Sequence, residues 1–201
     1  MRIIGGTAAG RILSVPEGLG VRPTQDKVKQ ALFNSLGNRV HGARILDLFA
    51  GSGALGLESL SRGAVGIVSI ELSPKHAQYY KQNLKSTQLD VRAVDLRVLD
   101  VFKALGRLSV DAETFDLIVA DPPYGDKNVG RRSTSFAQRL LDDVLLPSLL
   151  KPGGLFVLGH TKRDSLDLPK VWHENKLLKH GDTLMRILSV DAEVLTHPAT
   201  S

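Results

Sequence analysis

The tetrapeptide 121–124 (Asp121, Pro122, Pro123, Tyr124) combines residue types that can hold a flat ring bearing an amino group. It directly follows the apolar run 115–120, which predicts a buried strand. Each proline lacks an N–H and has a fixed φ, so two in a row cannot continue a sheet ladder or lie inside a helix. The chain must leave the sheet in a stiff turn, with a carboxylate to accept amino hydrogens and an aromatic ring to stack. The alternative is an ordinary Pro-Pro turn that begins with an aspartate.

The second informative segment is the glycine-rich stretch 51–56, which fits the pattern G-x-G-x-x-G. It lies between an apolar run and a helical pattern. About twenty residues further on, Glu71 ends the next predicted strand, where an acid can accept hydrogen bonds from ribose hydroxyls. This arrangement predicts a nucleoside site. The alternative is a tight strand-to-helix turn beside a surface glutamate.

Asp47, close before the glycines, bears on which nucleoside is bound. A carboxylate there is unfavourable beside a pyrophosphate but favourable beside the sulfonium and ammonium of S-adenosylmethionine. The roughly 150 residues that follow also leave little room for a separate substrate domain. S-adenosylmethionine is therefore favoured over a nicotinamide dinucleotide, which stays open. A further acid is expected near the adenine amino group, and Asp100 is preferred to Asp95.

Alternating strand and helix patterns must position these residues. Predicted strands cover 44–49, 65–70, 96–99, 115–120 and 155–158, and helical patterns cover 55–61, 73–84 and 136–150. Such alternation predicts an α/β fold with a doubly wound, mostly parallel sheet. The turn 180–182 predicts a C-terminal antiparallel strand. Ligands bind outside the carboxyl ends of such strands, so the acids named above are expected in one crevice.

Composition limits the class of protein. The 201 residues suit a single domain, 1–201, with 42% hydrophobic and 23% charged residues, as in an ordinary globular protein. No apolar run reaches the roughly 20 residues of a membrane span, and residues 1–6 lack the charged and apolar regions expected of a secretory signal. With no cysteine, thiolate metal sites are excluded, and the histidines lack metal-ligand spacing, so no metal is expected. The net charge of +5 favours a polyanionic partner such as nucleic acid.

Three N-terminal blocks carry a resemblance to a known family. They are 2–11 (Arg-Ile-Ile-Gly-Gly with a later Gly-Arg), 22–34 (Arg-Pro-Thr through Leu-Phe-Asn) and 47–58 (the glycine loop and its flanks). With 121–124 and the late Gly-Asp-Thr at 181–183, the chain resembles class I S-adenosylmethionine-dependent methyltransferases of the DPPY type. More narrowly, it resembles the bacterial RsmD family of 16S ribosomal RNA guanine-N2 methyltransferases. The resemblance implies a seven-stranded Rossmann-like sheet, with residues 1–40 as an extension flanking cofactor and substrate.

The resemblance also implies the reaction and its residues. A methyl group passes from S-adenosylmethionine to the exocyclic N2 of a guanine in 16S ribosomal RNA. The catalytic residues are then Asp121, Pro122, Pro123 and Tyr124. The cofactor-binding residues are Asp47, Phe49, Gly51, Ser52, Gly53, Glu71, Leu72, Asp100 and Val101.

Basic residues near the turn and in the N-terminal blocks are candidates for holding the RNA backbone. The substrate-binding set is Arg22, Thr24, Lys27, Lys127, Arg131 and Arg132. For the basic residues the alternative is a solvated surface, and Thr24 is an alternative cap for a helix that begins at Gln25.

The chain also departs from the family pattern. Where the family often has an acid after the fifth strand, this chain has Gly159-His160-Thr161, and His180 replaces a tyrosine before the late glycine. Segment 126–135 is longer than usual. These departures leave the reaction intact and bear on the RNA contacts.

Other readings of the sequence stay open. The nearest is a DNA adenine-N6 or cytosine-N4 methyltransferase, although 201 residues leave no room for the target-recognition domain such enzymes usually carry. Another is a non-catalytic RNA-binding module, which predicts loss of the glycine loop or of Asp121, and both are present. The preferred reading is a cytoplasmic monomer acting on 16S rRNA, on the small subunit or on an assembly intermediate, without a membrane partner.

Overall fold

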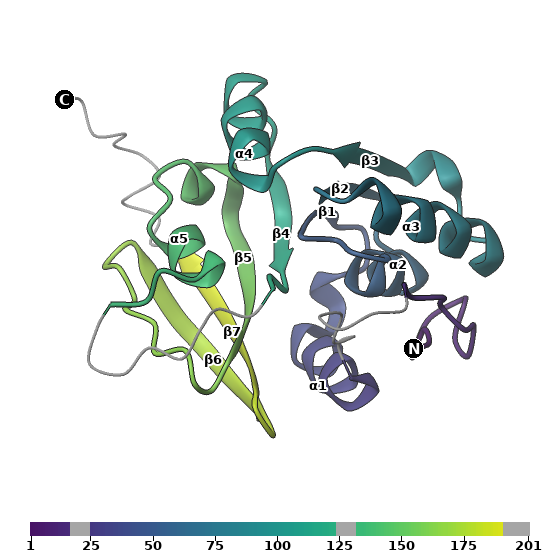
Figure 1. Ribbon diagram of the computed structural model, residues 1–201, viewed down its shortest axis with the longest axis horizontal. Helices are drawn as coiled ribbons and strands as arrows, with labels where there is room; N and C mark the ends of the chain where they lie inside the picture. The colour runs from purple at the N-terminus through teal and green to yellow at the C-terminus, as the bar shows by residue number, and fades with distance from the viewer. Residues whose placement is uncertain (17–24, 124–131, 191–201) are drawn as a thin grey trace.

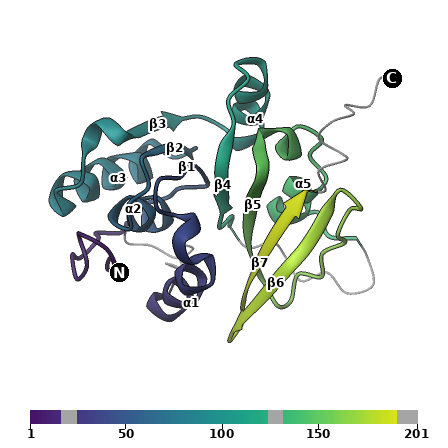
Figure 2. The same ribbon diagram turned by 180° about the vertical axis from the view of Figure 1, so that it is seen from behind.

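The computed structural model describes residues 1–16, 25–123 and 132–190. Within these ranges, seven strands form one sheet with helices around it (Figures 1 and 2). The strands are β1 (Arg44–Leu48), β2 (Gly66–Glu71), β3 (Val94–Val98), β4 (Phe115–Ala120), β5 (Leu150–Thr161), β6 (Trp172–His180) and β7 (Thr183–Val190). The α-helices are α1 (Asp26–Leu36), α2 (Ala54–Ser61), α3 (Pro74–Thr87), α4 (Val101–Val110) and α5 (Phe136–Leu141), and three 3-10 turns are η1 (Gly37–Arg39), η2 (Val91–Ala93) and η3 (Leu146–Leu149).

The strand order is β3-β2-β1-β4-β5-β7-β6. The five strands from β3 to β5 run parallel, while β7 is antiparallel to both β5 and β6. The predicted doubly wound, mostly parallel sheet with an antiparallel C-terminal strand is confirmed. The chain order reverses at β1, which has β2 on one side and β4 on the other. Such a switch point leaves a crevice outside the carboxyl ends of the strands.

Two hydrophobic clusters cover the sheet. One joins α1, α2 and α3 to the N-terminal segment and includes Leu32, Leu57 and Tyr80. The other joins α4, α5 and η3 to the sheet and includes Leu105 and Leu140. The central strands are apolar and buried at nearly every position because helices cover them on both sides.

Several local predictions are confirmed. Strand β4 has the predicted bounds, and Ser73 caps α3 by accepting a hydrogen bond from the His76 backbone N–H at 3.3 Å, with Pro74 in the first helical position. The turn between β6 and β7 lies at 181–182, with Gly181 at a φ of +59°.

The predicted helix over 136–150 is wrong. Helix α5 ends at Leu141, a 3-10 turn follows at η3, and β5 begins at Leu150. The Asp143 carboxylate accepts hydrogen bonds from the backbone N–H groups of Leu145 and Leu146 and so forms a local turn. This turn interrupts the helix that the apolar spacing predicts. Strand β3 lies at Val94–Val98 and not at 96–99.

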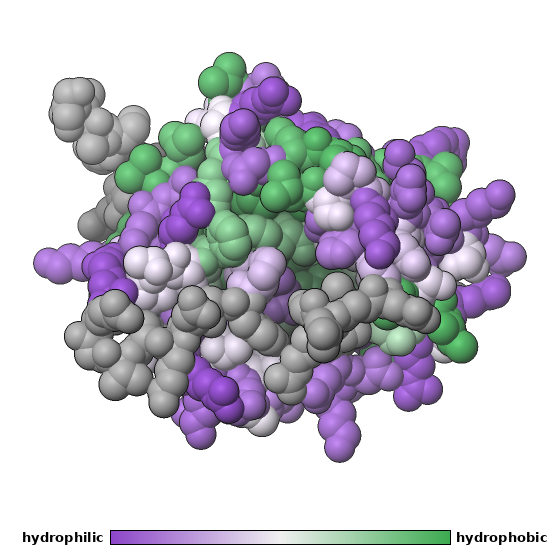
Figure 3. Space-filling model, viewed as in Figure 1, coloured by the Kyte–Doolittle hydropathy of each residue, from purple (hydrophilic) through white to green (hydrophobic). Residues whose placement is uncertain are grey.

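The N-terminal segment 1–16 lies against α2 and α3 (Figure 1). A single bridge pairs Arg2 with Ile12, and Ile3 and Leu13 are buried in the same cluster as α1 to α3. Within the described ranges, no helix has the length and apolar character needed to cross a bilayer. Apolar surface gathers across the middle of the face drawn in Figure 3, with hydrophilic residues around it.

Candidate active site

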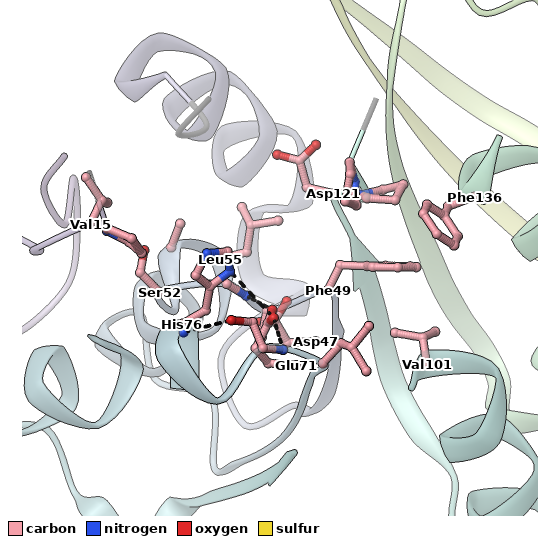
Figure 4. A pocket seen from close by; sticks show the side chains of 18 of the residues that line it. Val15, Asp47, Phe49, Ser52, Leu55, Glu71, His76, Val101, Asp121 and Phe136 are labelled. Atoms are coloured by element: carbon pink, nitrogen blue, oxygen red, sulfur yellow. Dashed lines mark hydrogen bonds and ion pairs between the residues drawn. The ribbon is translucent and has the colours of Figure 1, made fainter. Parts of the chain in front are cut away.

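A cavity of about 330 Å³ opens at the carboxyl ends of β1, β2 and β4, at the switch point of the sheet (Figure 4). Its volume lies within the range of roughly 300–1,000 Å³ found for small-molecule sites. Its described lining residues are Met1, Val15, Pro16, Asp47, Phe49, Ala50, Gly51, Ser52, Ala54, Leu55, Glu71, Leu72, Ser73, His76, Asp100, Val101, Asp121, Pro122, Pro123 and Phe136. The glycine-rich segment and the Pro-Pro turn therefore share one cavity, although about seventy residues of sequence separate them.

The glycine-rich loop holds its shape through left-handed backbone and hydrogen bonds. Phe49, Gly51 and Gly53 have φ values of +57°, +57° and +92°. The positive φ of Phe49 is unusual for a residue with a side chain, and such residues cluster at functional sites. The Glu71 carboxylate accepts the Gly51 N–H at 2.7 Å, which fixes the loop to the end of β2.

Glu71 also organises the start of α3. Its other carboxylate oxygen accepts the Ser73 backbone N–H at 2.7 Å, and His76 Nδ1 lies 3.5 Å from that oxygen. Each carboxylate oxygen retains acceptor capacity toward the cavity after these bonds, because it has two lone-pair sites. Glu71 can therefore position the loop and still accept a ligand hydroxyl.

Asp47 supplies a buried carboxyl group beneath the loop. Its exposed fraction is 2%, and one of its oxygens accepts the Gly56 N–H at 3.0 Å. The pKa of Asp47 is raised to about 8, chiefly by burial and also by the nearby carboxylates of Glu71 and Asp121, against the lowering effect of the Gly56 hydrogen bond. A Cβ added at Gly56 would lie 2.7 Å from the same oxygen, so the glycine is needed for this approach.

The charge balance of the cavity favours a cation. Four carboxyl groups line its described part, from Asp47, Glu71, Asp100 and Asp121, and His76 is the one basic side chain among the described lining residues. A cationic ligand would relieve the mutual repulsion of these carboxylates.

The Pro-Pro turn leaves the end of β4 over the cavity. Asp121 is half-buried and Pro122 is buried, while Pro123 is exposed. The Asp121 carboxylate lies against Gly159 of the neighbouring strand β5, where an added Cβ would come 2.5 Å from Asp121 Oδ1 and 3.1 Å from Met185 Sδ. The absence of a side chain at Gly159 therefore leaves room for the carboxylate in this position.

Aromatic and aliphatic side chains form the wall of the cavity beside the turn (Figure 4). The rings of Phe49 and Phe136 are 5.3 Å apart between centroids, and Phe102 lies 6.3 Å from Phe136. The Arg139 guanidinium lies 3.9 Å from the centroid of Phe102. With Leu72 and Val101 also in the lining, this wall suits a flat heteroaromatic ring.

Asp100 and Asp95 occupy different places. Asp100 lines the cavity and caps α4 by accepting the Lys103 N–H at 3.1 Å. Asp95 lies on the edge strand β3, is ion-paired with Arg97 and is not part of the lining. We therefore keep Asp100 as the proposed contact to an adenine amino group.

The structure brings together most of the residues expected to bind cofactor, namely Asp47, Phe49, Gly51, Ser52, Glu71, Leu72, Asp100 and Val101. Gly53 is not in the lining. It is the N-cap of α2, and an added Cβ would meet Leu57 at 2.9 Å and Tyr80 at 3.1 Å, so its place is in the packing beneath the loop.

Of the six expected substrate contacts, the structure describes Lys27 and Arg132, and of the expected catalytic residues it describes all but Tyr124. Arg22, Thr24, Tyr124, Lys127 and Arg131 lie outside the described residues. Lys27 is exposed on α1, whose N-cap is Gln25 without a side-chain cap bond. Arg132 pairs with Asp142 at 2.7 Å and with Asp167 at 3.4 Å, and it does not line the cavity.

Nine of the described lining residues are not among the predicted site residues: Met1, Val15, Pro16, Ala50, Ala54, Leu55, Ser73, His76 and Phe136. Ser73 and His76 follow the end of β2 directly, and that position is a usable sequence signal. Met1, Val15 and Pro16 carry no local signal, because their place depends on how the N-terminal segment folds back over α2 and α3.

The chain is similar in sequence and fold to several known proteins. A family model described as "Conserved hypothetical protein 95" matches residues 1–189. The ribosomal RNA small subunit methyltransferase D of Haemophilus influenzae is 33% identical over 186 residues, which is 91% of this chain and 89% of the relative. A solved hypothetical protein of Thermus thermophilus matches with a TM-score of 0.77 and 31% identity, over 94% of this chain and 99% of that one. The T. thermophilus 16S rRNA N2 methyltransferase RsmC, solved with AdoMet and guanosine, matches with a TM-score of 0.59 and 26% identity, over 80% of this chain and 41% of that one.

Proposed function

The chain belongs to the family described as Conserved hypothetical protein 95, the RsmD family, and from this premise we propose that it methylates the N2 amino group of a guanine in 16S ribosomal RNA with S-adenosylmethionine as donor. The observation that carries the proposal is the single cavity lined by both the glycine loop and the Pro-Pro turn. Methyl transfer needs the donor and the acceptor nitrogen side by side, and this cavity has residues suited to each.

The described residues fit S-adenosylmethionine. The buried Asp47 and the three other carboxyl groups suit its ammonium and sulfonium charges, and Glu71 suits its ribose hydroxyls. The apolar wall of Phe49, Leu72 and Val101 suits the adenine ring, with Asp100 in reach of the amino group at its edge.

The chain's own residues would act mainly by positioning. S-adenosylmethionine, when bound, supplies a methyl group on a sulfonium that departs as a neutral thioether. Asp121 and the Pro122 carbonyl would accept the two hydrogens of the guanine amino group and favour a tetrahedral nitrogen with an available lone pair. The nitrogen forms the new bond to carbon as the carbon–sulfur bond breaks, and the amino group then loses one proton. Such positioning can supply about 7–11 kcal/mol of the acceleration.

The RNA assignment is supported by the relatives. The H. influenzae relative is named a ribosomal RNA small subunit methyltransferase, and the T. thermophilus neighbour was solved with guanosine and is named for N2 methylation of 16S rRNA. A base in a helix must leave its stack to enter such a pocket, which costs a few kcal/mol. In this proposal Tyr124 stacks on the base, and Arg22, Thr24, Lys27, Lys127, Arg131 and Arg132 contact the RNA backbone. We further propose that the protein works as a cytoplasmic monomer on 16S rRNA, free or in a small-subunit particle.

The test is methylation with labelled S-adenosylmethionine of RNA and small subunits from a strain that lacks this gene. Naked 16S rRNA, assembled 30S subunits and assembly intermediates form separate arms, so the preferred substrate is identified in the same experiment. Label mapped to a guanine N2 is the expected result. Label on adenine or cytosine, or label in DNA offered as a competitor, would reject the guanine assignment.

A further inference from the structure

Asn83, on the buried side of α3, makes three hydrogen bonds that join two separate parts of the chain. Its exposed fraction is 1%. Its Oδ1 accepts the Ser14 backbone N–H at 2.8 Å, and its Nδ2 donates to the Ser14 carbonyl at 2.8 Å and to the Ser52 carbonyl at 2.9 Å. One side-chain amide thus fastens the N-terminal segment to the glycine-rich loop.

The chemistry of the three partners fixes the orientation of this amide. One partner is a donor and two are carbonyl acceptors, so turning the amide over would place NH₂ against an N–H and oxygen against two carbonyls. An isosteric carboxylate cannot satisfy the same set, because an ionised carboxylate only accepts. The position therefore requires an amide and not merely a polar side chain of this size.

The residues on both sides of this link line the cavity. Ser52 of the loop and Val15 of the N-terminal segment both line the cavity (Figure 4). Val15 and Pro16, which also lines the cavity, follow Ser14 directly. Met1 lines it as well, and Leu13 donates its backbone N–H to the Met1 carbonyl at 2.8 Å. The segment 1–16 is thus a wall of the cavity and not only a terminal extension.

A second, independent anchor holds the other end of this wall. The Glu58 carboxylate, fully buried on α2, accepts the backbone N–H groups of Ile4 at 2.7 Å and Gly5 at 2.9 Å. The fully buried Lys29 of α1 lies 3.3 Å from the same carboxylate and also donates to the Arg2 carbonyl. The segment is therefore fixed near residues 4–5 by a charged group and near residue 14 by the Asn83 amide.

We propose that Asn83 is a positioning residue for S-adenosylmethionine, locking the N-terminal segment 1–16 onto the glycine-rich loop so that cofactor binding and the closed position of this segment depend on each other. The inference rests on the proposed function, because it takes the cavity to be the cofactor site. A ligand that contacts the wall at Val15 and Pro16 binds only where the segment is closed. By reciprocity, the bound ligand must then hold the segment closed.

The first experiment needs no variant. Hydrogen exchange of the wild-type protein is followed at the amides of Ile3, Gly10, Leu13 and Ser14, all of which donate within or from the segment. At a cofactor concentration of about 100 times Kd, exchange through openings that release the ligand should slow by up to about a hundredfold. Unchanged exchange in a protein that binds S-adenosylmethionine would overturn the inference and leave the proposed function standing. Absence of any cofactor binding would instead reject the proposed function.

The second experiment compares Asn83→Asp with Gln82→Glu. Gln82 is exposed on the same helix, so its variant makes the same change from amide to acid without touching the link. Asn83→Asp should weaken S-adenosylmethionine binding by at least about tenfold, with kcat at saturating cofactor within a few-fold of wild type. It should also abolish the slowing of exchange in segment 1–16, while Gln82→Glu retains both. Equal affinity in the two variants, or a loss in kcat alone, would overturn the role given to Asn83.

Discussion

The two halves of the cavity are held in place by different means. On the glycine-loop side, side chains from other elements bond to the backbone: Glu71 to Gly51, Asp47 to Gly56 and Asn83 to Ser52. On the Pro-Pro side, the stiffness of two prolines and the absence of a side chain at Gly159 contribute to where Asp121 lies. Hydrogen bonds thus preorganise the glycine-loop half, and shape contributes to the Pro-Pro half. Losing a side chain that bonds to the loop backbone should therefore displace the first half, and adding a single methyl group at Gly159 should displace the second.

The largest effect is expected from Asp121→Ala. Removing the carboxylate takes away the acceptor for an amino hydrogen of the base, and kcat should fall by about 10³-fold. The affinity for S-adenosylmethionine, measured by calorimetry, should stay within a few-fold of wild type, since the bonds of the glycine loop are untouched. Turnover like that of the wild type would reject the role given to Asp121. Asp111→Ala is a matched control, because Asp111 is exposed at the end of α4 and does not line the cavity.

Asp47→Asn tests the other half and should show the opposite pattern. The substitution removes a charge that faces a cationic ligand and keeps the shape of the side chain. The Kd for S-adenosylmethionine should rise by about 10- to 100-fold, and kcat at saturating cofactor should change far less. If kcat fell by a larger factor than the affinity for S-adenosylmethionine, Asp47 would not act mainly in cofactor binding. The separate roles given to the two halves would then be wrong.

Gly159→Ala examines the shape argument with a single methyl group. Its Cβ would come 2.5 Å from Asp121 Oδ1, so the carboxylate must move away from its place over the cavity. A displacement of this size should lower kcat by about tenfold or more, with cofactor affinity nearly unchanged. Gly153→Ala is the control on the same strand, because nothing lies within 4 Å of a Cβ added there, although its φ of +74° adds local strain. If Gly159→Ala lost no more kcat than Gly153→Ala, steric fit would not be what positions Asp121.

The sequence predicts the hydrogen-bonded half of the site better than the sterically fitted half. Gly51, Ser52 and Glu71 lie in one local strand–turn–helix unit with strand ends at known positions, so their meeting follows from spacing. Gly159 and Phe136 reach the site from strands and helices far along the chain, and no spacing rule indicates them. The same limit explains the wrong helix over 136–150. There the apolar positions fit a helical period, but Asp143 and Pro147 form a turn that the period does not reveal.

The N-terminal segment shows a further limit of prediction from sequence. The family pattern drew attention to residues 2–11, but their role as a wall of the cavity depends on Glu58 and Asn83, two buried polar residues on separate helices. Lys29 lies in the basic block 22–34, yet its side chain is completely buried against Glu58. Burial of a charge depends on partners distant in sequence, so no local pattern predicts it.

The smallest expected effect is a pH dependence of cofactor binding that belongs to the glycine-loop half alone. Asp47 has a pKa raised to about 8 in the ligand-free cavity by burial, with the carboxylates of Glu71 and Asp121 adding to the shift. The hydroxyl of Tyr80, whose pKa is raised by burial, stays neutral, and His76 faces Glu71 across 3.5 Å. A bound cation favours the ionised carboxylate, so the pKa of Asp47 falls on binding and a proton is released. Below pH 8 the affinity for S-adenosylmethionine should therefore drop, by up to about tenfold for each pH unit until the pKa of the complex is reached.

The sign of this dependence distinguishes Asp47 from the other groups in the cavity. Calorimetry at pH 7 in buffers of different ionisation enthalpy should show release of up to about one proton per cofactor bound. Asp47→Asn should release almost none and should bind with nearly constant affinity between pH 6 and pH 8. In the Asp121→Ala variant, the affinity for S-adenosylmethionine should still drop as the pH falls, as in the wild type, because the buried Asp47 carboxyl remains. Proton uptake on binding, or a dependence that survives in Asp47→Asn, would mean that another group titrates and that the cation does not pair with Asp47.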